Sequence, residues 1–245
     1  YFYSKMRLAH ISKPFILNSK MDRVEAAIKY LDDKGKDYKT FSLEDKEDDI
    51  HAEDIKFVSM QSEFTAVYDG QRTHVKIKQP GTYSVENALV ALYSAHLMGV
   101  DTNSIVSALE SFELEGRNTV ISTDDELIIC WVNYAHNGLS FKESYDAIDE
   151  SFPGIPVISI FGTPGHRSRY RLIEMCEMAA KRSSLNILVP DDPAHRPFED
   201  IAKDMAEVVE ANGGKYKIFP VRADAIEYAF SIVKEPTVML IAGKG

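Results

Sequence analysis

The sequence predicts an α/β protein in two parts, residues 1–117 and 118–245, with a mostly parallel, doubly wound sheet in the second part. From Glu126 onward, short apolar runs alternate with helical patterns. Alternation of this kind is typical of a parallel sheet covered by helices on both faces. The expected strands are Leu127–Val132, Val157–Phe161, Asn186–Val189, Tyr216–Phe219 and Val238–Ile241.

The first part has a different pattern, because three of its expected strands follow one another along the chain without a helix between them. An Asp69-Gly70 pair between alternating runs predicts a hairpin. Pro80-Gly81 ends this section, and Gly99 is expected to terminate the helix that follows. The expected elements are a helix over 1–8, a strand at 15–17, a helix over 22–31, a strand over 38–43, a solvated acidic loop over 44–54, antiparallel strands within 55–78, a helix from Ser84 to Met98, and a helix capped by Asp101 or Thr102.

Four helical patterns separate the strands of the second part. The first two lie on either side of the run Ile155–Phe161, and Leu172, Met175 and Ala179 recur at helical spacing in the second. The last two are expected over Glu199–Ala211 and Ala223–Val233. The boundary between the two parts is placed near Arg117, where Glu115-Gly116-Arg117 leads out of the first part.

Composition excludes several classes of protein. The 245 residues are 44% hydrophobic and carry a formal charge of −10, which argues against a nucleic-acid surface. No apolar run reaches the roughly 20 residues of a membrane span. Cys130 and Cys176 lie in apolar runs and are expected to be buried thiols in a reducing compartment, so the cytoplasm is the expected location. Both ends resemble cuts through a longer protein.

The polar clusters of the second part all follow predicted strands. Asn133-Tyr134-Ala135-His136 follows the first strand, the Gly162–Arg169 loop the second and Asp191-Asp192 the third, while Arg222 and Gly243 follow the last two. The carboxyl ends of parallel strands form the ligand-binding edge of such a sheet. Arginines in one loop and paired carboxylates in the next suit a zwitterion such as a free amino acid.

Seven motifs also carry a family resemblance. Asn87 in SVENALVA, Gly116-Arg117, WVNYAHN, FGTPGHRSR, PDDPA, VRADAIEYA and LIAGKG occur in the order and spacing of the Mur ligases, the ATP-dependent enzymes that build the peptidoglycan stem peptide. The chain is most similar to the MurE type, which adds the third residue to UDP-N-acetylmuramoyl-L-alanyl-D-glutamate. The resemblance implies that residues 1–117 are the second part of the central ATPase domain and residues 118–245 the Rossmann-like C-terminal domain.

The resemblance also implies a mechanism. ATP phosphorylates the D-glutamate γ-carboxylate, and the amine of the incoming amino acid attacks the acyl phosphate. The glycine-rich phosphate loop of the family and its uridine-binding domain are not found in this sequence and are expected before Tyr1. The chain alone is therefore expected to be inactive, and the enzyme is expected to be a monomer.

Five residues match positions that hold ATP and Mg²⁺ in the family. Lys5 matches the lysine whose carbamylation makes an oxygen ligand for Mg²⁺; the alternative is an exposed helix lysine. Asn87 matches the asparagine that reads adenine, with a helix cap as the alternative. Arg117 matches an arginine near the nucleotide, or is a solvated linker residue. Asn133 stands where the family has a ribose-binding aspartate, and His136 follows it, with a buried structural histidine as the alternative.

The amino acid is expected to bind between the later loops. Arg167 matches the arginine that grips its carboxylate, and the backbone at Gly243 approaches it. Ligases that add meso-diaminopimelate carry an arginine where this chain has Ala194. The tetrad Asp191-Asp192-Pro193-Ala194 matches the lysine-adding type instead, because two carboxylates attract the lysine ammonium; the alternative is a strand-ending turn. His195 and Arg196 are positive groups nearby.

These observations predict a ligase that adds L-lysine to UDP-N-acetylmuramoyl-L-alanyl-D-glutamate. The alternatives are a ligase that adds meso-diaminopimelate, ornithine or another diamine, and a folylpolyglutamate-type ligase, which the Asp-Asp-Pro-Ala loop disfavours. A non-catalytic paralogue is a further alternative, because Asn133 and the loop around Arg167 depart from the family pattern. A dehydrogenase is disfavoured, since no G-x-G-x-x-G follows the Leu127–Val132 strand.

Overall fold

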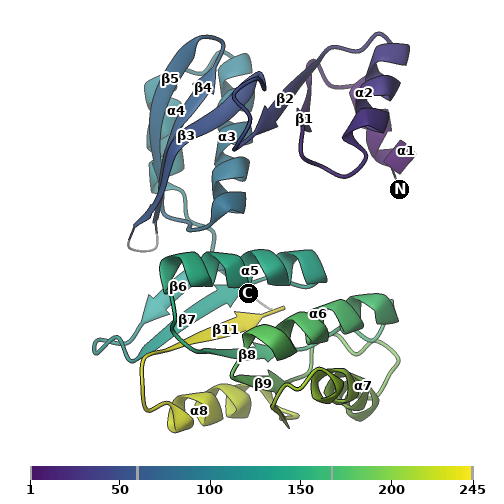
Figure 1. The fold of residues 1–245 in the computed structure, drawn as a ribbon, viewed down its shortest axis with the longest axis vertical. Coiled ribbons are helices and arrows are strands. Elements are labelled where there is room, and N and C mark those ends of the chain that lie inside the picture. The colour runs from purple at the N-terminus through teal and green to yellow at the C-terminus, as the bar shows by residue number, and fades with distance from the viewer. Residues whose placement is uncertain (1, 59–60, 167, 244–245) are drawn as a thin grey trace. The chain divides into compact units, whose positions relative to one another are not determined.

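A computed structural model describes residues 2–58, 61–166 and 168–243 of the chain (Figure 1). The chain divides into two compact units, Tyr1–Phe112 and Glu113–Gly245. Within the described residues, no helix has both the length and the apolar character needed to cross a bilayer.

The first unit is a mixed sheet with helices. In the described part of this unit, its elements are α1 (Phe2–Met6), a 3₁₀ turn η1 (Arg7–His10), β1 (Phe15–Asn18), α2 (Val24–Asp33), β2 (Tyr38–Ser42), β3 (Ile50–Val58), β4 (Gln61–Tyr68), β5 (Gln71–Ile77), α3 (Thr82–Leu97) and α4 (Thr102–Ser111). The strands lie in the order β1-β2-β3-β4-β5. β1, β2 and β3 run parallel, and β3, β4 and β5 are antiparallel.

Two apolar clusters hold this unit together. One lies between the β3–β5 sheet and α3, with α4 at its edge, and contains Phe64, Tyr68, Leu89 and Leu92. Alternate residues of β4 are buried, as expected for a strand with one face on a core. The other cluster joins α1 and α2 to β1 and includes Leu31. Both predicted signals in this region, the hairpin at Asp69-Gly70 and the cap at Asp101, are confirmed.

Two expectations for the first unit are wrong. The acidic stretch 44–54 is not one solvated loop, because β3 begins at Ile50 and carries Glu53 into the sheet. Glu53 is compatible with a strand because Lys46 and Arg72 neutralise its carboxylate, at 2.8 and 2.6 Å. Ser84 does not cap α3 either: the helix begins at Thr82, and the Ser84 hydroxyl donates to the carbonyl of Pro80.

The second unit is the predicted α/β domain. Counted over its described residues, its elements are β6 (Arg117–Ser122), β7 (Ile128–Asn133), α5 (Gly138–Ser151), β8 (Val157–Phe161), α6 (Arg169–Arg182), β9 (Leu185–Leu188), α7 (Phe198–Ala211), β10 (Tyr216–Ile218), α8 (Arg222–Ile232) and β11 (Thr237–Ala242). The strand order is β10-β9-β8-β11-β7-β6. All pairs are parallel except β6 with β7, which confirms the mostly parallel sheet. The edge strand β6 was not predicted.

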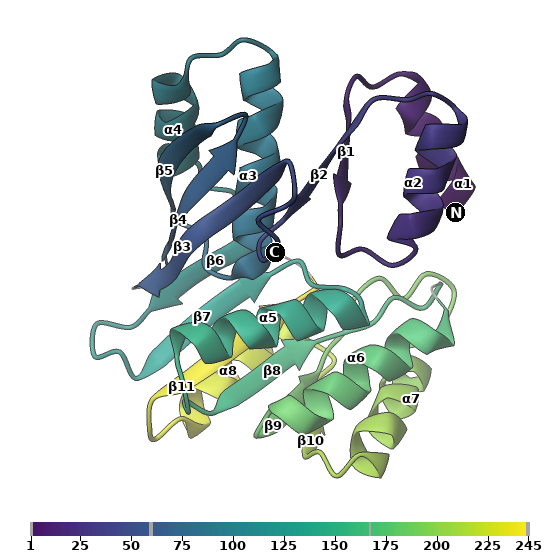
Figure 2. The same cartoon turned by 45° about the horizontal axis from the view of Figure 1, so that its top comes forward.

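Helices cover both faces of this sheet (Figure 2). On one face, Ile158 and Ile160 of β8 pack with Ala225 and Ala229 of α8 in one apolar cluster. On the other face, the Ser159 hydroxyl lies 2.7 Å from the hydroxyl of Tyr145 on α5. Because successive strand residues point to opposite faces, both faces of β8 are covered: all five of its residues are buried, and Ser159 is its one polar residue.

The cysteines follow the prediction in part. Neither forms a disulfide; Cys176 on α6 is buried, whereas Cys130 on β7 is half-buried. Burial raises the pKa of the Cys176 thiol to about 12, and it raises the pKa of Cys130 as well. Both side chains are therefore neutral thiols at physiological pH.

Candidate functional site

Arg117 and Asn133 lie opposite each other at one side of the second sheet. Asn133 is the last residue of β7, and Arg117, the first residue of β6, is its register partner. They come from separate sequence motifs, and the antiparallel pairing of β6 brings them together. Arg117 is thus part of the second sheet, and the alternative of a linker arginine is wrong.

Tyr134 joins Arg117 and His136 in one surface group. The Arg117 Cζ lies 4.3 Å from the centroid of the Tyr134 ring, a cation–π distance. The ring of His136 lies 5.1 Å from the same ring, and its Nδ1 donates to the Tyr134 carbonyl at 2.9 Å. His136 is only half-buried, so it is not a core histidine. An exposed aromatic ring beside a guanidinium and an imidazole offers a face on which a planar base can stack.

Asn133 is held by its amide nitrogen. Nδ2 donates to Asn118 Oδ1 at 2.5 Å and to Ser144 Oγ at 3.1 Å. Both amide hydrogens are used in this way, and Oδ1 has no partner among the described residues. Asn133 therefore presents one neutral acceptor, where a carboxylate would present two charged oxygens.

Asn87 and Lys5 belong to the first unit. Asn87 is exposed in the second turn of α3, which begins after Gly81, so the alternative role as a helix cap is wrong. Lys5 is exposed on the short helix α1. Their proposed roles toward adenine and Mg²⁺ remain predictions, because each unit is a separate compact body.

The loops after β8 and β9 fit together through two glycines. A Cβ on Gly162 would lie 2.3 Å from the carbonyl oxygen of Val189, and a Cβ on Gly165 would lie 2.2 Å from that of Pro193. The Gly165 N–H donates to the Asp192 carbonyl at 2.8 Å. A side chain at either glycine would force the loops apart, so glycine is required for this approach.

The loop after β11 reaches the same place. Gly243 has φ 93°, and a Cβ on it would lie 3.3 Å from Asp191 Oδ2 and 4.0 Å from the carbonyl oxygen of Gly162. The Gly243 N–H donates to the Asn133 carbonyl at 3.2 Å. The carboxyl ends of β7, β8, β9 and β11 thus gather Asn133, Gly162, Asp191 and Gly243 at one edge of the sheet.

Asp192 and Ala194 shape the next turn. The Ala194 N–H donates to Asp192 Oδ1 at 3.1 Å, and Ala194 adopts φ 51°. The Asp192 side chain is 63% exposed, and its Oδ2 lies 3.9 Å from His166 Nδ1. Asp192 therefore shapes the turn through Oδ1 while its carboxylate stays open to solvent.

Arg222 is a functional candidate to which sequence reasoning assigned no role. It begins α8, and its Nη1 and Nη2 donate to the carbonyls of Ala242 and Pro190 at 3.2 and 3.3 Å. Burial lowers the pKa of this guanidinium, and the nearby Asp191 carboxylate opposes that shift. Arg222 thus joins the loop after β9 to the end of β11. Its position after a strand was visible in the sequence, but its buried contacts were not.

The predicted carboxylate-gripping residue, Arg167, lies outside the described residues. The other residues predicted for the amino-acid site, Asp191, Asp192, Pro193, Ala194 and Gly243, lie on the loops after β9 and β11. Their roles toward a substrate remain predictions.

The donor groups fit a nucleotide better than a metal ion held by this chain alone. Arg117, Tyr134, Asn133 and His136 combine stacking, charge and one amide acceptor, which suits a base and ribose. Among the described residues, no cluster of three or more histidine, cysteine, aspartate or glutamate side chains could hold a metal. A divalent cation would need ligands from outside that set, such as phosphate oxygens.

A doubly wound domain with polar loops at its strand ends places this chain in the class of α/β proteins that bind ligands at that edge of the sheet. Family models narrow this class. The Mur ligase middle domain matches residues 1–95, and the Mur ligase, glutamate ligase domain matches residues 116–245. The chain belongs to the Mur ligase family.

Individual relatives agree with this assignment. A UDP-N-acetylmuramoyl-L-alanyl-D-glutamate–2,6-diaminopimelate ligase of Clostridium acetobutylicum is 31% identical over 100% of this chain and 50% of its own length. A solved structure of a ligase with the same name is 24% identical with a TM-score of 0.60, covering 100% of this chain and 51% of that one. MurF from Acinetobacter baumannii has a TM-score of 0.74 at 18% identity, over 99% and 52% of the two chains. The chain spans about half the length of these relatives.

Proposed function

We propose that this chain is part of an ATP-dependent ligase of peptidoglycan synthesis that joins a diamino acid to UDP-N-acetylmuramoyl-L-alanyl-D-glutamate. ATP supplies the phosphoryl group that activates the acceptor carboxylate. In the second unit, Arg117, Tyr134, Asn133 and His136 would hold a base and ribose. In the first unit, Asn87 stays a prediction for a residue that reads adenine. Lys5, once carbamylated, would supply an oxygen to Mg²⁺. The unit of residues 1–112 would be the later part of the ATPase domain, and the unit of residues 113–245 would be the amino-acid domain.

The observation that carries the proposal is the meeting of Gly162, Asp191 and Gly243 at the tips of β8, β9 and β11. Gly162 lets the loop after β9 approach closely, Gly243 lies beside the Asp191 carboxylate, and Asp192 adds a second acid on the adjacent turn. Two carboxylates attract an ammonium group and repel a carboxylate. This supports an incoming amino acid with a positive side chain.

Two amino acids are each supported by an observation, and ornithine or another diamine stays an alternative. L-lysine is favoured by Asp191 and Asp192 and by Ala194, which supplies no positive charge. meso-Diaminopimelate is favoured by the names of the relatives that match this chain. Its distal end carries both an ammonium and a carboxylate, so it needs a positive group in addition to the acids.

The test is an assay of the complete protein with UDP-N-acetylmuramoyl-L-alanyl-D-glutamate, ATP and Mg²⁺. L-Lysine, meso-diaminopimelate or L-ornithine is added in parallel, and phosphate release and product mass are measured. We expect phosphate release that depends on one diamino acid, with a product heavier by that residue. No product with any of the three would refute the proposal.

A variant of Asp191 tests whether the loop after β9 binds the amino acid. Asp191→Asn should raise the KM for the preferred amino acid about tenfold, as expected for a lost ion pair of about 1.4 kcal/mol. Asp200→Asn, an exposed change in the first turn of α7, is the matched control and should leave that KM unchanged. An unchanged KM in both variants would remove Asp191 from the site.

A further inference from the structure

Two side chains hold the amide group of Asn133 at the end of β7. Asn118 lies on β6, Asn133 is the last residue of β7, and Ser144 lies on α5 (Figure 1). The Asn133 Nδ2 donates one hydrogen to Asn118 Oδ1 at 2.5 Å and the other to Ser144 Oγ at 3.1 Å. Three separate elements thus meet at one amide group.

A further hydrogen bond of Ser144 decides which way this amide faces. Ser144 is fully buried, and its hydroxyl donates its single hydrogen to the carbonyl of Ser140, one turn earlier in α5, at 2.8 Å. Only lone pairs remain on Ser144 Oγ, so the group that faces it on Asn133 has to be a donor. With the amide reversed, one hydroxyl hydrogen would face two acceptors. The buried serine therefore selects the orientation in which the amide nitrogen faces α5.

Asn118 supports the same orientation from the other side. It adopts φ 55° at the bulge between Arg117 and Thr119, where β6 pairs with β7. Asparagine tolerates this left-handed conformation better than most residues do. As the extra residue of the bulge, Asn118 has no register partner on β7. Its side-chain oxygen is thereby placed to accept from the amide of Asn133.

The oxygen of the same amide is left for a ligand. Asn133 is only half-buried, and its Oδ1 has no partner among the described residues. An amide oxygen is an acceptor without a net charge, so its best complement on a ligand is a neutral donor such as a hydroxyl group. Arg117, the register partner of Asn133, and the Tyr134 ring against it supply a positive charge and a stacking face alongside.

We propose that Asn118 and Ser144 are positioning residues that hold the Asn133 oxygen toward a ribose hydroxyl of the bound nucleotide. This inference rests on the proposed function, which places a base and ribose in this site. The two residues act through Asn133 and not by contact with the nucleotide. Without them the amide is free to turn, so its hydrogen bond with the hydroxyl weakens. The preference for a ribose over a deoxyribose thus depends on residues behind the one that contacts the sugar.

The test compares the binding of ATP, 2′-deoxy-ATP and 3′-deoxy-ATP to the complete protein by calorimetry, with Mg²⁺ present. In the parent, we expect one of the two deoxy analogues to bind about three- to tenfold more weakly than ATP, as for the loss of one neutral hydrogen bond. Ser144→Ala should weaken ATP binding toward the level of that analogue and change the analogue by less than about twofold. A general structural effect would weaken all three nucleotides alike.

A matched pair of variants at position 118 provides a second readout, which stays valid if Ser144→Ala folds poorly. Asn118→Gly and Asn118→Asp both accept the φ of 55°, but only the aspartate keeps an acceptor oxygen for Asn133. Asn118→Gly should therefore lose the preference for ATP. Asn118→Asp should retain it, even if the added charge changes all three affinities. Ser122→Ala, an exposed change at the far end of β6, is the control and should leave all three affinities unchanged.

Three outcomes would overturn the inference. A preference for ATP that survives in both Ser144→Ala and Asn118→Gly would show that Asn133 needs neither residue. Equal weakening of all three nucleotides would leave Asn118 and Ser144 with a structural role alone. Equal affinity of the parent for ATP and both analogues would show that Asn133 accepts from no ribose hydroxyl. If the complete protein still forms the ligation product in these cases, the proposed function stands while this inference fails; no ATP binding at all would refute both.

Discussion

Arg222 shows how one half-buried side chain can tie a loop to the end of a strand. Its guanidinium donates to the carbonyls of Pro190 and Ala242, which belong to segments more than fifty positions apart in the sequence. Its Nε has no partner among the described residues, so the group remains in place although one donor is unsatisfied. Because an unsatisfied buried donor costs free energy, we expect Arg222 to be needed for the geometry of these segments.

Replacing Arg222 should destabilise the protein. Arg222→Met keeps a long apolar stem and leaves both carbonyls without their donors, so unfolding should become easier by about 1–3 kcal/mol. Urea unfolding of the chain measures this. Lys203→Met, an exposed change on α7, should stay within about 0.5 kcal/mol of the parent. Equal stability of the two variants would mean that the loops do not depend on Arg222.

At the scale of elements, the loops after β8 and β9 form a tightly packed pair. Gly162→Ala should destabilise the protein by about 1–3 kcal/mol, because the new methyl group would meet the Val189 carbonyl at 2.3 Å. Urea unfolding and amide hydrogen exchange in the two loops measure the effect. Gly213→Asn is the control, since that site is open and its φ of 75° is one that asparagine tolerates. A stable Gly162→Ala protein with protected loops would contradict the packing.

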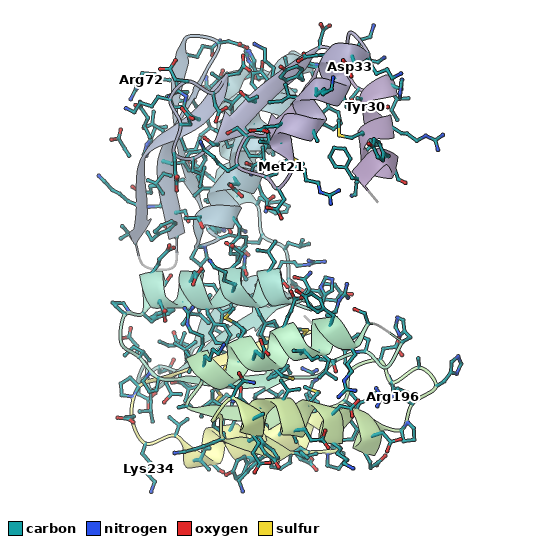
Figure 3. All side chains as sticks on the ribbon, turned by 45° about the vertical axis from the view of Figure 1, so that its right-hand side comes forward. Met21, Tyr30, Asp33, Arg72, Arg196 and Lys234 are labelled. Carbon is teal, nitrogen blue, oxygen red and sulfur yellow. The ribbon has the colours of Figure 1, made fainter. Side chains whose placement is uncertain are left out.

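Glu53 links elements of the first unit in a pH-dependent way. Lys46 and Arg72 lower the pKa of its carboxyl to about 2. Figure 3 labels Arg72. A carboxyl with a lowered folded-state pKa stabilises the fold above its unfolded pKa, and this contribution disappears as the pH falls through the folded value. The melting temperature of Glu53→Gln should therefore lie below that of the parent at pH 7, and the difference should shrink between about pH 4.5 and pH 2.

The exposed neighbour of Glu53 is the control. Asp54→Asn keeps a residue that accepts the φ of 55° at this position, and no salt bridge involves Asp54 in the described residues. Its melting temperature should follow that of the parent at every pH. A constant difference for Glu53→Gln between pH 7 and pH 2 would show that the ion pairs do not stabilise the sheet.

The sequence predicted those helices and strands whose own residues form a clear apolar pattern. β8 is a nearly unbroken apolar run, interrupted by Ser159, and it was predicted with its correct bounds. β6 was missed because RNTVIS has only two apolar residues and its pairing contains a bulge between Arg117 and Thr119. The start of β3 was missed because an acidic run predicts a loop. The charge of Glu53 is neutralised by residues outside the strand, which the run itself does not reveal.

The candidate site was also predicted only where its own residues form a local pattern in the sequence. Clusters after strands identified the edge of the sheet, since parallel strands bring their carboxyl ends together. The roles of Tyr134 and Arg222 depend on contacts with distant segments, such as the cation–π pair between Tyr134 and Arg117. Such contacts follow from the packing of the fold and leave no local pattern in the sequence.

At the scale of the whole molecule, each unit has its own apolar core. In the first unit, the core lies between the β3–β5 sheet and α3. In the second unit, one core lies between the sheet and α8 and includes Ile160 and Met239, and Trp131 and Phe141 are also fully buried. A unit with its own core and a closed set of strand pairings is expected to fold by itself.

Residues 113–245 should therefore fold without the rest of the chain. We expect a single cooperative urea transition, with backbone amide resonances that overlay those of the same residues in the intact chain. A fragment of residues 123–245 is the matched comparison, because it lacks β6 and leaves β7 as an edge strand with unpaired backbone groups. It should be less stable than the longer fragment. If residues 113–245 gave no cooperative transition while the intact chain did, the core of this unit would depend on the first unit for its formation.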